Sequence, residues 1–266
     1  EPFLHPDILN IVLYAKLKNI EVFIYSCGVV ENNGEICSLQ DETLESLANL
    51  NLDKIIFNLQ ASKMELFDYI TGTHDRFDLV KNSIYQASKL GIYTEVHFVP
   101  MKLNYNEIEP TLNLARELGV KQISFLRLVV QERAFNNRKL LMLCEQEENK
   151  IKNDLSLISK RHNDIKVRIG IPLTKKFEGK KCGAGSEKLI IRYDGAVLPC
   201  EAYKYIKSVN KGREIKPENI NFLRLKEIYF NSEFLNIFRR EITKYHQENH
   251  SCEVCPAQSK IKALLR

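Results

Sequence analysis

Amphipathic stretches alternate with short apolar runs along the first half of the chain. Apolar positions recur at helical spacing in the segments at residues 8–17, 41–50, 77–90 and 107–118. Nearly continuous apolar runs follow them at residues 20–25, 54–59, 92–99 and 122–130. Strands that are covered by helices are expected to be apolar in this way. The repeated helix–strand order therefore predicts an α/β fold with a parallel sheet.

Polar side chains interrupt the predicted strands at a few positions. These are Asn58 and Gln60 near one strand end, Glu95 and His97 on one face of the next strand, and Arg127 on the last. In a barrel-like parallel sheet such side chains line the lumen or face a site at the carboxyl ends of the strands. Taken singly, each could equally be a paired structural residue. Their recurrence on successive strands favours a site.

A charged helix is expected at residues 140–162, and the regular alternation ends near residue 163. The elements expected after it are a strand at 164–172, a hairpin at 188–200 and helices within 221–248. The hairpin has the two-residue turn signal Asp194-Gly195. We predict two domains, residues 1–165 and residues 166–266.

Four cysteines surround this hairpin. Cys182 precedes it, Cys200 ends it, and Cys252 and Cys255 form a C-x-x-C pair further on. Two thiolates on one tight turn can reach a single metal centre, so the four predict a site for zinc or for an iron–sulfur cluster. The spacing alone leaves these two open. The other cysteines, Cys27, Cys37 and Cys144, fit no metal spacing.

Composition narrows the class of protein only a little. The 266 residues are 44% hydrophobic and 27% charged, as in ordinary globular proteins. The net charge of +5 comes from 39 basic and 34 acidic residues that are spread evenly, so nucleic acid is not an expected partner. No apolar run approaches the roughly 20 residues of a membrane helix, so a membrane is not expected either. Seven cysteines without a secretory segment favour reduced thiols and a cytoplasmic location.

Several strand-end segments resemble those of radical S-adenosylmethionine (SAM) enzymes. They are Glu1-Pro2, residues 24–28 (IYSCG), 57–62 (FNLQAS), 68–78, 95–104 (EVHFVPMKLN) and 127–134 (RLVVQERA), although Glu132 stands where glycine is usual. The cysteine region resembles a SPASM domain. Its C-x9–15-G-x4-C pattern fits Cys182, Gly195 and Cys200, and its next two ligands fit Cys252 and Cys255. Ile261 and Leu265 replace later cysteines of that pattern, as in the shortened twitch type.

The resemblance implies a fold and a pair of iron–sulfur clusters. The expected fold is a partial (β/α)6 TIM-like barrel, with about four of the six βα units, followed by a small C-terminal α+β twitch/SPASM domain. One auxiliary [4Fe–4S] cluster would be held by Cys182, Cys200, Cys252 and Cys255. The family's catalytic [4Fe–4S] motif, C-x3-C-x2-C, does not occur in the sequence. We expect its ligands in a missing N-terminal segment, so this chain alone should be inactive.

The resemblance also implies an activity. The family cleaves SAM to a 5′-deoxyadenosyl radical, which would abstract hydrogen from a peptide or a small molecule, with a donor such as flavodoxin or ferredoxin supplying electrons. The auxiliary cluster would transfer electrons or help to site the substrate. Residues expected to bind SAM or substrate are Glu1, Ser26, Asn58, Gln60, His97, Asn104 and Arg127. Glu1 would contact the methionine amino group, and no residue is assigned a catalytic role.

Two other classes of protein fit part of the sequence. In the first, the same four cysteines hold structural zinc in a binding or scaffold protein without catalysis. In the second, the chain is an α/β-barrel hydrolase or aldolase. The second class is disfavoured because the sequence has no nucleophile elbow, phosphate loop or paired-carboxylate motif.

Overall fold

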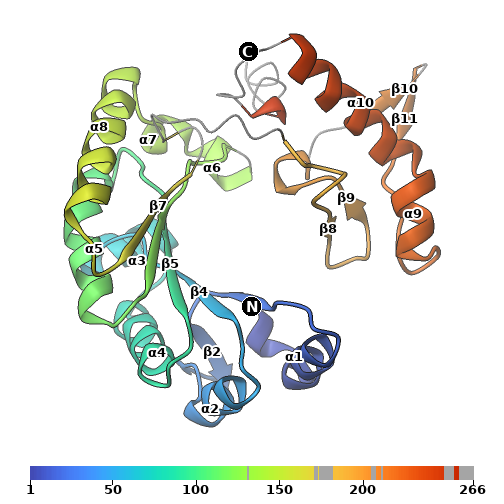
Figure 1. Ribbon diagram of the computed structural model, residues 1–266. Helices are drawn as coiled ribbons and strands as arrows, with labels where there is room; N and C mark the ends of the chain where they lie inside the picture. Colours follow the sequence, from blue (N-terminus) through green and yellow to red (C-terminus); the bar gives the residue numbers. More distant parts are fainter. Residues whose placement is uncertain are drawn as a thin grey trace. The chain divides into compact units, whose positions relative to one another are not determined.

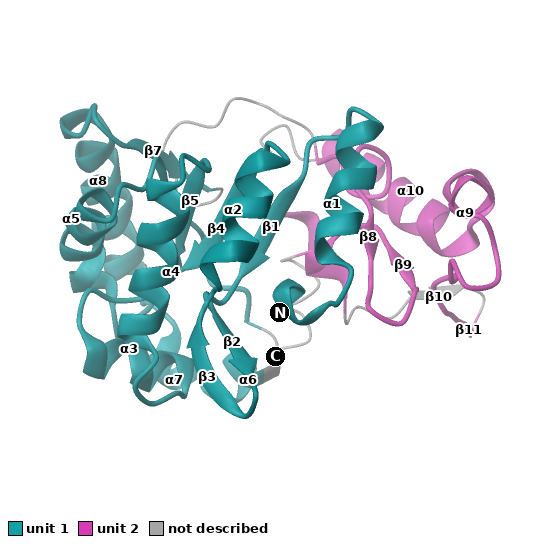
Figure 2. Ribbon diagram, turned by 90° about the horizontal axis from the view of Figure 1, so that it is seen from below, with its two compact units in different colours: residues 1–175 teal, residues 176–266 magenta. Residues whose placement is uncertain are grey.

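The chain forms two compact units, residues 1–175 (unit 1) and residues 176–266 (unit 2) (Figures 1 and 2). The computed structural model describes residues 1–130, 132–170, 173, 182–204, 208–210, 212–248 and 255–257. Among the helices described, none combines the length and the apolar character that a membrane span requires.

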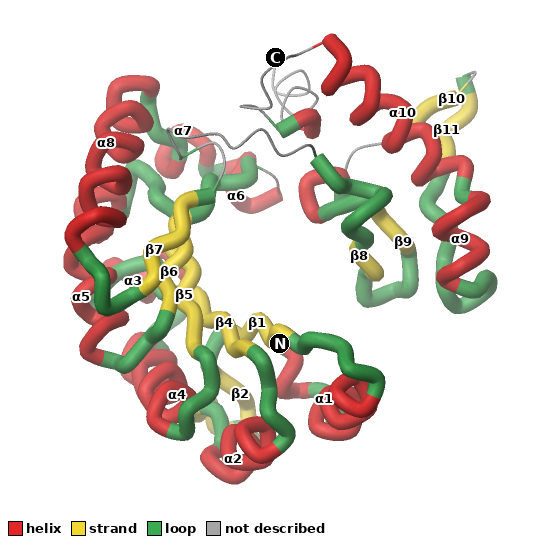
Figure 3. Tube along the Cα trace, viewed as in Figure 1, coloured by secondary structure: helices red, strands yellow, loops and turns green. Residues whose placement is uncertain are grey.

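Unit 1 is built on a parallel sheet. Within the described residues its strands, in spatial order, are β1 (Phe23–Ser26), β4 (Lys54–Asn58), β5 (Thr94–Phe98), β6 (Gln122–Phe125) and β7 (Lys166–Ile169) (Figure 3). All neighbouring pairs are parallel, which confirms the predicted α/β fold. The sheet has one strand more than the four expected. The reason is that residues 166–169, which we had assigned to the second domain, pair with β6, so the division between the units falls after Lys175 and not after residue 165.

Helices cover one face of this sheet (Figure 3). The helices of unit 1 are η1 (Pro2–Leu4), α1 (Ile8–Leu17), α2 (Asp41–Asn49), α3 (Met64–Thr71), α4 (Phe77–Lys89), η2 (Tyr105–Glu107), α5 (Ile108–Glu117), α6 (Glu132–Asn136), α7 (Arg138–Leu141) and α8 (Glu145–Arg161). Alternate strand residues such as Phe57, Val96 and Ile123 face them and are fully buried in one apolar core. The strand residues between these point to the opposite face.

Three local features of unit 1 differ from the sequence prediction. A hairpin of β2 (Val29–Asn32) and β3 (Glu35–Ser38) follows β1, and its turn places Asn33 and Gly34 at positive φ, as a two-residue hairpin turn requires. Helix α3 was also not expected. The long helix predicted at residues 140–162 is divided into α7 and α8 because the backbone is extended at Cys144, whose N–H bonds to the Glu147 carboxylate at 2.7 Å and caps α8.

One edge of the sheet is open. Within the described chain β1 pairs only with β4, so no described strand lies along its other edge. The neighbouring helix α1 is apolar around its circumference, and it buries Val12 completely but leaves Ile11, Tyr14 and Leu17 exposed. This side of unit 1 is therefore unusually apolar for a surface.

Unit 2 is smaller and has its own core. Its described elements are β8 (Ile190–Ile191), β9 (Val197–Leu198), η3 (Glu201–Tyr203), β10 (Ser208–Asn210), β11 (Arg213–Ile215), α9 (Leu225–Asn231) and α10 (Glu233–Glu248). Strands β8 and β9 form the predicted antiparallel hairpin. Aromatic and aliphatic side chains of α10, such as Phe234 and Phe238, pack with Val197 and Leu198 of β9 in an apolar cluster.

Candidate functional site

The face of the sheet opposite the helices is polar. Strand alternation and register place Lys54 of β4, Glu95 and His97 of β5, and Gln122 and Ser124 of β6 on this face. These side chains come from the same alternation that buries Phe57 and Val96 on the other side. The sequence prediction that Glu95 and His97 share a lumen-facing surface agrees with this register.

Glu95 is the centre of a hydrogen-bonded network. Its carboxylate accepts bonds from Lys54 Nζ at 2.6 Å and from Ser124 Oγ at 2.5 Å, and it lies 3.0 Å from His97 Nε2. Burial alone would raise the pKa of Glu95, but the bonds from His97, Lys54 and Ser124 outweigh it and lower the pKa to about 2. Glu95 is thus a carboxylate at neutral pH although it is only 2% exposed.

His97 is a buried member of this network and lies beside Tyr25. One ring nitrogen faces Glu95, and the ring packs edge-on against Tyr25 of β1 at a centroid distance of 5.5 Å. Tyr25 itself is exposed. The two rings give the polar face an aromatic wall next to a hydrogen-bonding group.

The carboxylate of Glu1 is bound at the carboxyl end of β1. It accepts hydrogen bonds from Ser26 Oγ at 3.0 Å and from the Cys27 N–H at 2.7 Å. Ser26 is buried and also accepts a bond from the Gly28 N–H. Burial and then the Glu1 carboxylate raise the pKa of the Cys27 thiol, so Cys27 is protonated here. Glu1 and Ser26, both expected to bind cofactor, are therefore adjacent.

Gln60 and Asn104 brace the loops after β4 and β5. Gln60 Oε1 accepts a bond from the Val99 N–H at 2.9 Å, and Asn104 Nδ2 donates to the Gln60 carbonyl at 2.8 Å. Asn104 is completely buried, and its Oδ1 accepts a bond from the Met101 N–H. Both side-chain amides are thus hydrogen-bonded to backbone groups, and these bonds hold the two loops together.

A cavity of about 620 Å³ opens at the carboxyl ends of β4, β5 and β6. Its wall includes Asn58 and Gln60 after β4, Met101 after β5, Leu128 after β6 and Arg133 of α6. Apolar residues form most of the wall, and the polar groups lie at a few places, as in typical small-molecule sites. Arg127 is half-buried on the segment that follows β6 and does not line this cavity.

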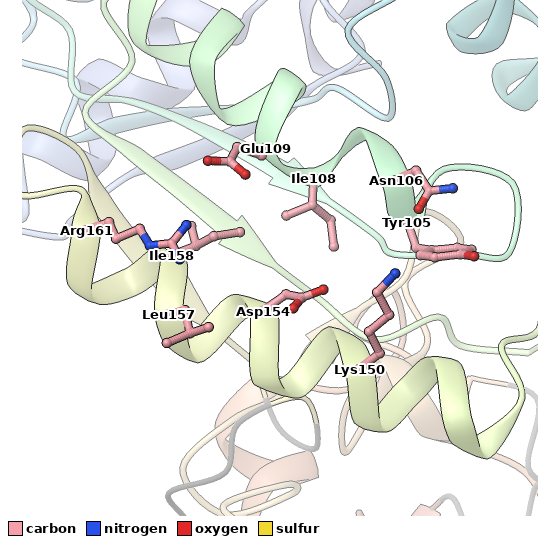
Figure 4. A pocket seen from close by; sticks show the side chains of 9 residues that line it. All are labelled: Tyr105, Asn106, Ile108, Glu109, Lys150, Asp154, Leu157, Ile158 and Arg161. Atoms are coloured by element: carbon pink, nitrogen blue, oxygen red, sulfur yellow. The ribbon is translucent and has the colours of Figure 1, made fainter.

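A smaller pocket of about 190 Å³ lies between α8 and the start of α5 (Figure 4). Side chains of Lys150 and Asp154 extend from α8 toward Tyr105, and the Lys150 ammonium lies 5.7 Å from the Tyr105 ring. This pocket belongs to the helical layer. It contains none of the residues predicted to bind cofactor.

The turn of the hairpin in unit 2 requires glycine. Gly195 has φ of +87°, and a Cβ added there would lie 2.5 Å from Asn219 Oδ1. The Asn219 amide donates to the Asp194 carbonyl at 2.7 Å, and Arg192 pairs with the Asp194 carboxylate. The turn thereby fixes β9, which leads directly to Cys200.

Three of the four predicted cluster ligands border the same apolar cluster. Cys182, Cys200 and Cys255 all pack against the apolar cluster of unit 2, while Cys252 lies outside the described residues. Burial is the main cause that raises the pKa of Cys200, and the charges of Cys255 and Cys182 raise it further. Such thiols become thiolates when a metal centre supplies positive charge.

The donor set fits an iron–sulfur cluster. Cys182, Cys200 and Cys255 offer thiol donors beside an apolar core, and thiolates are the ligands of the irons in a [4Fe–4S] cluster. Thiolates can also hold a single zinc.

Two residues near these cysteines were not singled out from the sequence. The Cys182 N–H donates to His246 Nε2 of α10 at 3.0 Å, which ties the Cys182 loop to that helix. Tyr203 lies in the apolar cluster one turn after Cys200, and its N–H bonds to the Cys200 carbonyl at 3.0 Å. The closeness of Tyr203 to Cys200 in sequence was an available signal, whereas His246 required the folded structure.

Comparison with known proteins identifies both units. Residues 1–123 match the radical SAM superfamily, and residues 182–256 match the SPASM iron–sulfur cluster-binding domain. Along the chain, a match to the radical SAM model is thus followed by a match to the SPASM model. These families imply [4Fe–4S] clusters and SAM as cofactors, and the three clustered cysteines fall inside the SPASM match.

Individual relatives are distant. The chain is 24% identical to PqqA peptide cyclase of Ruegeria pomeroyi over 90% of its own length and 61% of that protein. It is 26% identical to a probable GTP 3′,8-cyclase of Sulfurisphaera tokodaii, covering 75% of this chain and 63% of the relative. SuiB of Streptococcus suis, crystallised with its precursor peptide SuiA, shares the fold with a TM-score of 0.65 at 17% identity, covering 90% of this chain and 54% of SuiB. The chain thus spans less than two thirds of each of them.

Proposed function

We propose that the chain acts in a radical SAM enzyme that modifies a peptide. The observation that carries this proposal is the succession of a radical SAM domain and a SPASM domain with clustered thiols. The likeness to PqqA peptide cyclase and to the fold of SuiB supports a peptide over a small molecule as substrate.

In this proposal SAM occupies the carboxyl edge of the sheet. The cavity of about 620 Å³ is large enough for a ligand of this size. Asn58 and Arg133 supply polar groups on its wall, and Gln60 and Asn104 hold the loops in place. Glu1 would accept the ammonium group of the methionine moiety at the end of β1, where Ser26 and the Cys27 N–H orient its carboxylate.

The polar face of the sheet would receive the substrate. The ion pair between Lys54 and Glu95 fixes the ring of His97 through Glu95, so His97 and Tyr25 form a preorganised surface. The family's catalytic motif C-x3-C-x2-C does not occur within residues 1–266. When bound, the catalytic cluster and SAM supply hydrogen-atom abstraction, which is chemistry of the cofactor rather than of the side chains.

The SPASM unit would hold one auxiliary [4Fe–4S] cluster on Cys182, Cys200, Cys252 and Cys255. The apolar cluster behind the described thiols limits the access of water, which is one of the factors that set the potential of such a centre. We propose that this cluster transfers electrons or helps to site the substrate.

Anaerobic reconstitution of this chain with iron and sulfide tests the proposal. We expect about four irons per chain and the absorption and electron paramagnetic resonance spectra of a [4Fe–4S] cluster. Cys200→Ser and Cys255→Ser should abolish uptake, whereas Cys37→Ser, which changes a thiol of unit 1, should not. Uptake of one zinc with no iron would overturn the proposal in favour of a zinc-stabilised scaffold.

A further inference from the structure

A chain of hydrogen bonds crosses the polar face of the sheet in unit 1 and ends at His97. Tyr93 Oη donates to Gln122 Oε1 at 3.2 Å, and Gln122 Nε2 donates to Ser124 Oγ at 3.1 Å. The Ser124 hydroxyl in turn donates its hydrogen to the Glu95 carboxylate at 2.5 Å. Each donor in this chain has its acceptor, so the direction of every bond that leads to Glu95 is fixed.

This chain determines which ring nitrogen of His97 carries hydrogen. Glu95 is an ionised carboxylate that accepts bonds from Lys54 and Ser124, and an ionised carboxylate has no hydrogen to donate. His97 Nε2, which lies 3.0 Å from Glu95 Oε1, must therefore be the donor. In the neutral ring the single hydrogen then lies on Nε2, and Nδ1 keeps its lone pair as an acceptor.

Nδ1 of His97 is available to a ligand. No hydrogen bond to it is found among the described residues, although the residue as a whole is only 8% exposed. In the described chain, the side-chain atoms that are shut off from water without a partner belong to Ser88, Thr111, His162 and Arg239. Nδ1 is not one of these atoms, so it keeps contact with water. A donor on a ligand can replace that water.

Aromatic rings lie beside this acceptor. The ring of His97 packs edge-on against Tyr25 of β1, and strand alternation places Phe23 on the same face as Tyr25. Phe23 is 47% exposed and Tyr25 is 56% exposed. A ligand can therefore cover apolar surface here while one of its hydrogens reaches Nδ1.

Positive charges on the same face select against a cationic ligand. Register with Gln122 and Ser124 places Lys166 and Arg168 of β7 on this face, and both side chains are exposed. Among the described residues, neither has an acidic partner. They would repel an ammonium group but not a neutral N–H or O–H group. A carboxylate, for its part, has no hydrogen to donate to Nδ1.

We propose that His97 Nδ1 accepts a hydrogen bond from a neutral N–H or O–H group of the peptide substrate, and that Glu95 is the positioning residue that keeps Nδ1 free of hydrogen. This inference rests on the proposed function for the presence of a peptide substrate. The group recognised at this face is thus a hydroxyl, an amide or an aromatic N–H rather than a carboxylate or an ammonium.

The first test determines the tautomer of His97 in the wild-type chain of residues 1–266. Long-range proton–nitrogen correlation spectra of the chain with isotopically labelled histidine distinguish a nitrogen that carries hydrogen from one that does not. We expect the neutral ring to carry hydrogen on Nε2 and none on Nδ1. Hydrogen on Nδ1 in the wild type would overturn the inference.

Glu95→Gln should reverse this tautomer. Lys54 can only donate, so the new amide oxygen should turn toward Lys54 and its NH2 group toward His97. Nε2 must then accept, and the ring hydrogen should move to Nδ1. A merely structural role of Glu95 would not move this hydrogen, so an unchanged tautomer in the variant would overturn the positioning role.

The second test measures recognition with a matched pair of probes. Indole has one N–H donor and no acceptor, and 1-methylindole has the same ring without the donor. The chain contains no tryptophan, so the fluorescence of either probe can be followed during a titration. We expect the wild-type chain to bind indole about fivefold more tightly than 1-methylindole, which is the effect of one hydrogen bond.

This preference should depend on both residues of the pair. In His97→Phe, which keeps a ring beside Tyr25, the ratio of the two affinities should fall to about one, and Glu95→Gln should lose the preference as well. His74→Phe is the matched control, since His74 is exposed in the loop between α3 and α4, and its ratio should equal that of the wild type.

The outcomes keep this inference apart from the proposed function. Equal binding of the two probes by the wild type, or a preference for indole that persists in His97→Phe, overturns the inference alone. Failure of the chain to take up an iron–sulfur cluster overturns the proposed function, but it leaves the tautomer of His97 and the preference for indole unchanged.

Discussion

Glu95 in unit 1 is buried and Cys200 in unit 2 is half-buried, and burial acts to raise the pKa of both, yet the pKa shifts in opposite directions. Around Glu95 the protein supplies Lys54, His97 and Ser124 as partners, and the pKa falls to about 2. Around Cys200 it supplies an apolar core and two further thiols, and the pKa rises. Unit 1 therefore stabilises a buried charge with its own side chains, whereas in our proposal the thiols of unit 2 ionise only when a cluster supplies positive charge.

Removal of one cluster ligand should give the largest effect. In Cys200→Ala the reconstituted chain should lose its cluster, and unit 2 should lose on the order of several kcal/mol of stability because metal binding and folding are coupled. Hydrogen exchange of the α10 amides should accelerate strongly, while that of β5 in unit 1 stays unchanged. Equal acceleration in β5 would show that the units are not independent in this respect.

Removal of the central charge of unit 1 should have a smaller effect. Glu95→Gln leaves Lys54 without its counter-ion at a site where its side chain is 19% exposed, and we expect a loss of about 3 kcal/mol. Lys81→Gln is the control, since Lys81 pairs with Asp78 on the surface and should contribute less than about 0.5 kcal/mol. Denaturant unfolding of the two variants measures the difference, and equal losses would contradict the central place given to Glu95.

Because of Glu95, the stability of unit 1 should also depend on pH. The pKa of Glu95 is lowered from 4.5 to about 2, so its stabilising contribution is present above pH 4.5 and is lost as the pH falls toward 2. The loss should be on the order of 3 kcal/mol. Unfolding curves of unit 1 at pH 5 and pH 3 should therefore differ in the wild type and differ less in Glu95→Gln. An identical acid response in the variant would assign the effect to other carboxylates.

The smallest expected effect concerns the hairpin turn of unit 2. Gly195→Ala should cost about 2 kcal/mol, because alanine is strained at φ of +87° and its Cβ would meet Asn219. Gly212→Ala is the matched control, since Gly212 also has positive φ (+77°) but no atom within 4 Å of an added Cβ. Thermal unfolding of both variants isolates the contact with Asn219, and a greater loss in Gly212→Ala would contradict it.

The strands of unit 1 could be predicted because burial on the helical side gives them apolar runs. The hairpin turn at Asn33-Gly34 also has a clear local signal, but the strands beside it are short and mixed in polarity, and it was missed. Residues 166–169 were recognised as a strand, yet only their pairing with β6 shows which unit they belong to. Pairing over a long separation has no local signature.

The site was predictable to a different degree in each unit. Cysteine spacing pointed to Cys182, Cys200 and Cys255, and all three pack against the apolar cluster of unit 2, while their role as ligands stays a prediction. For Gln60 and Asn104, the sequence located the strand ends, but it could not show that both amides bind loop backbone. Side-chain direction at a strand end depends on neighbouring loops, so the roles in SAM binding stay predictions.

The open edge of β1 has a practical consequence. A strand edge with no described neighbour, together with the exposed side chains of Ile11, Tyr14 and Leu17, favours association between copies of the chain. Preparations of this chain should therefore aggregate as the protein concentration rises, even when the chain is folded. The substitutions Ile11→Lys and Leu17→Lys should reduce this aggregation, and they leave the thiols and the Glu95 network unchanged.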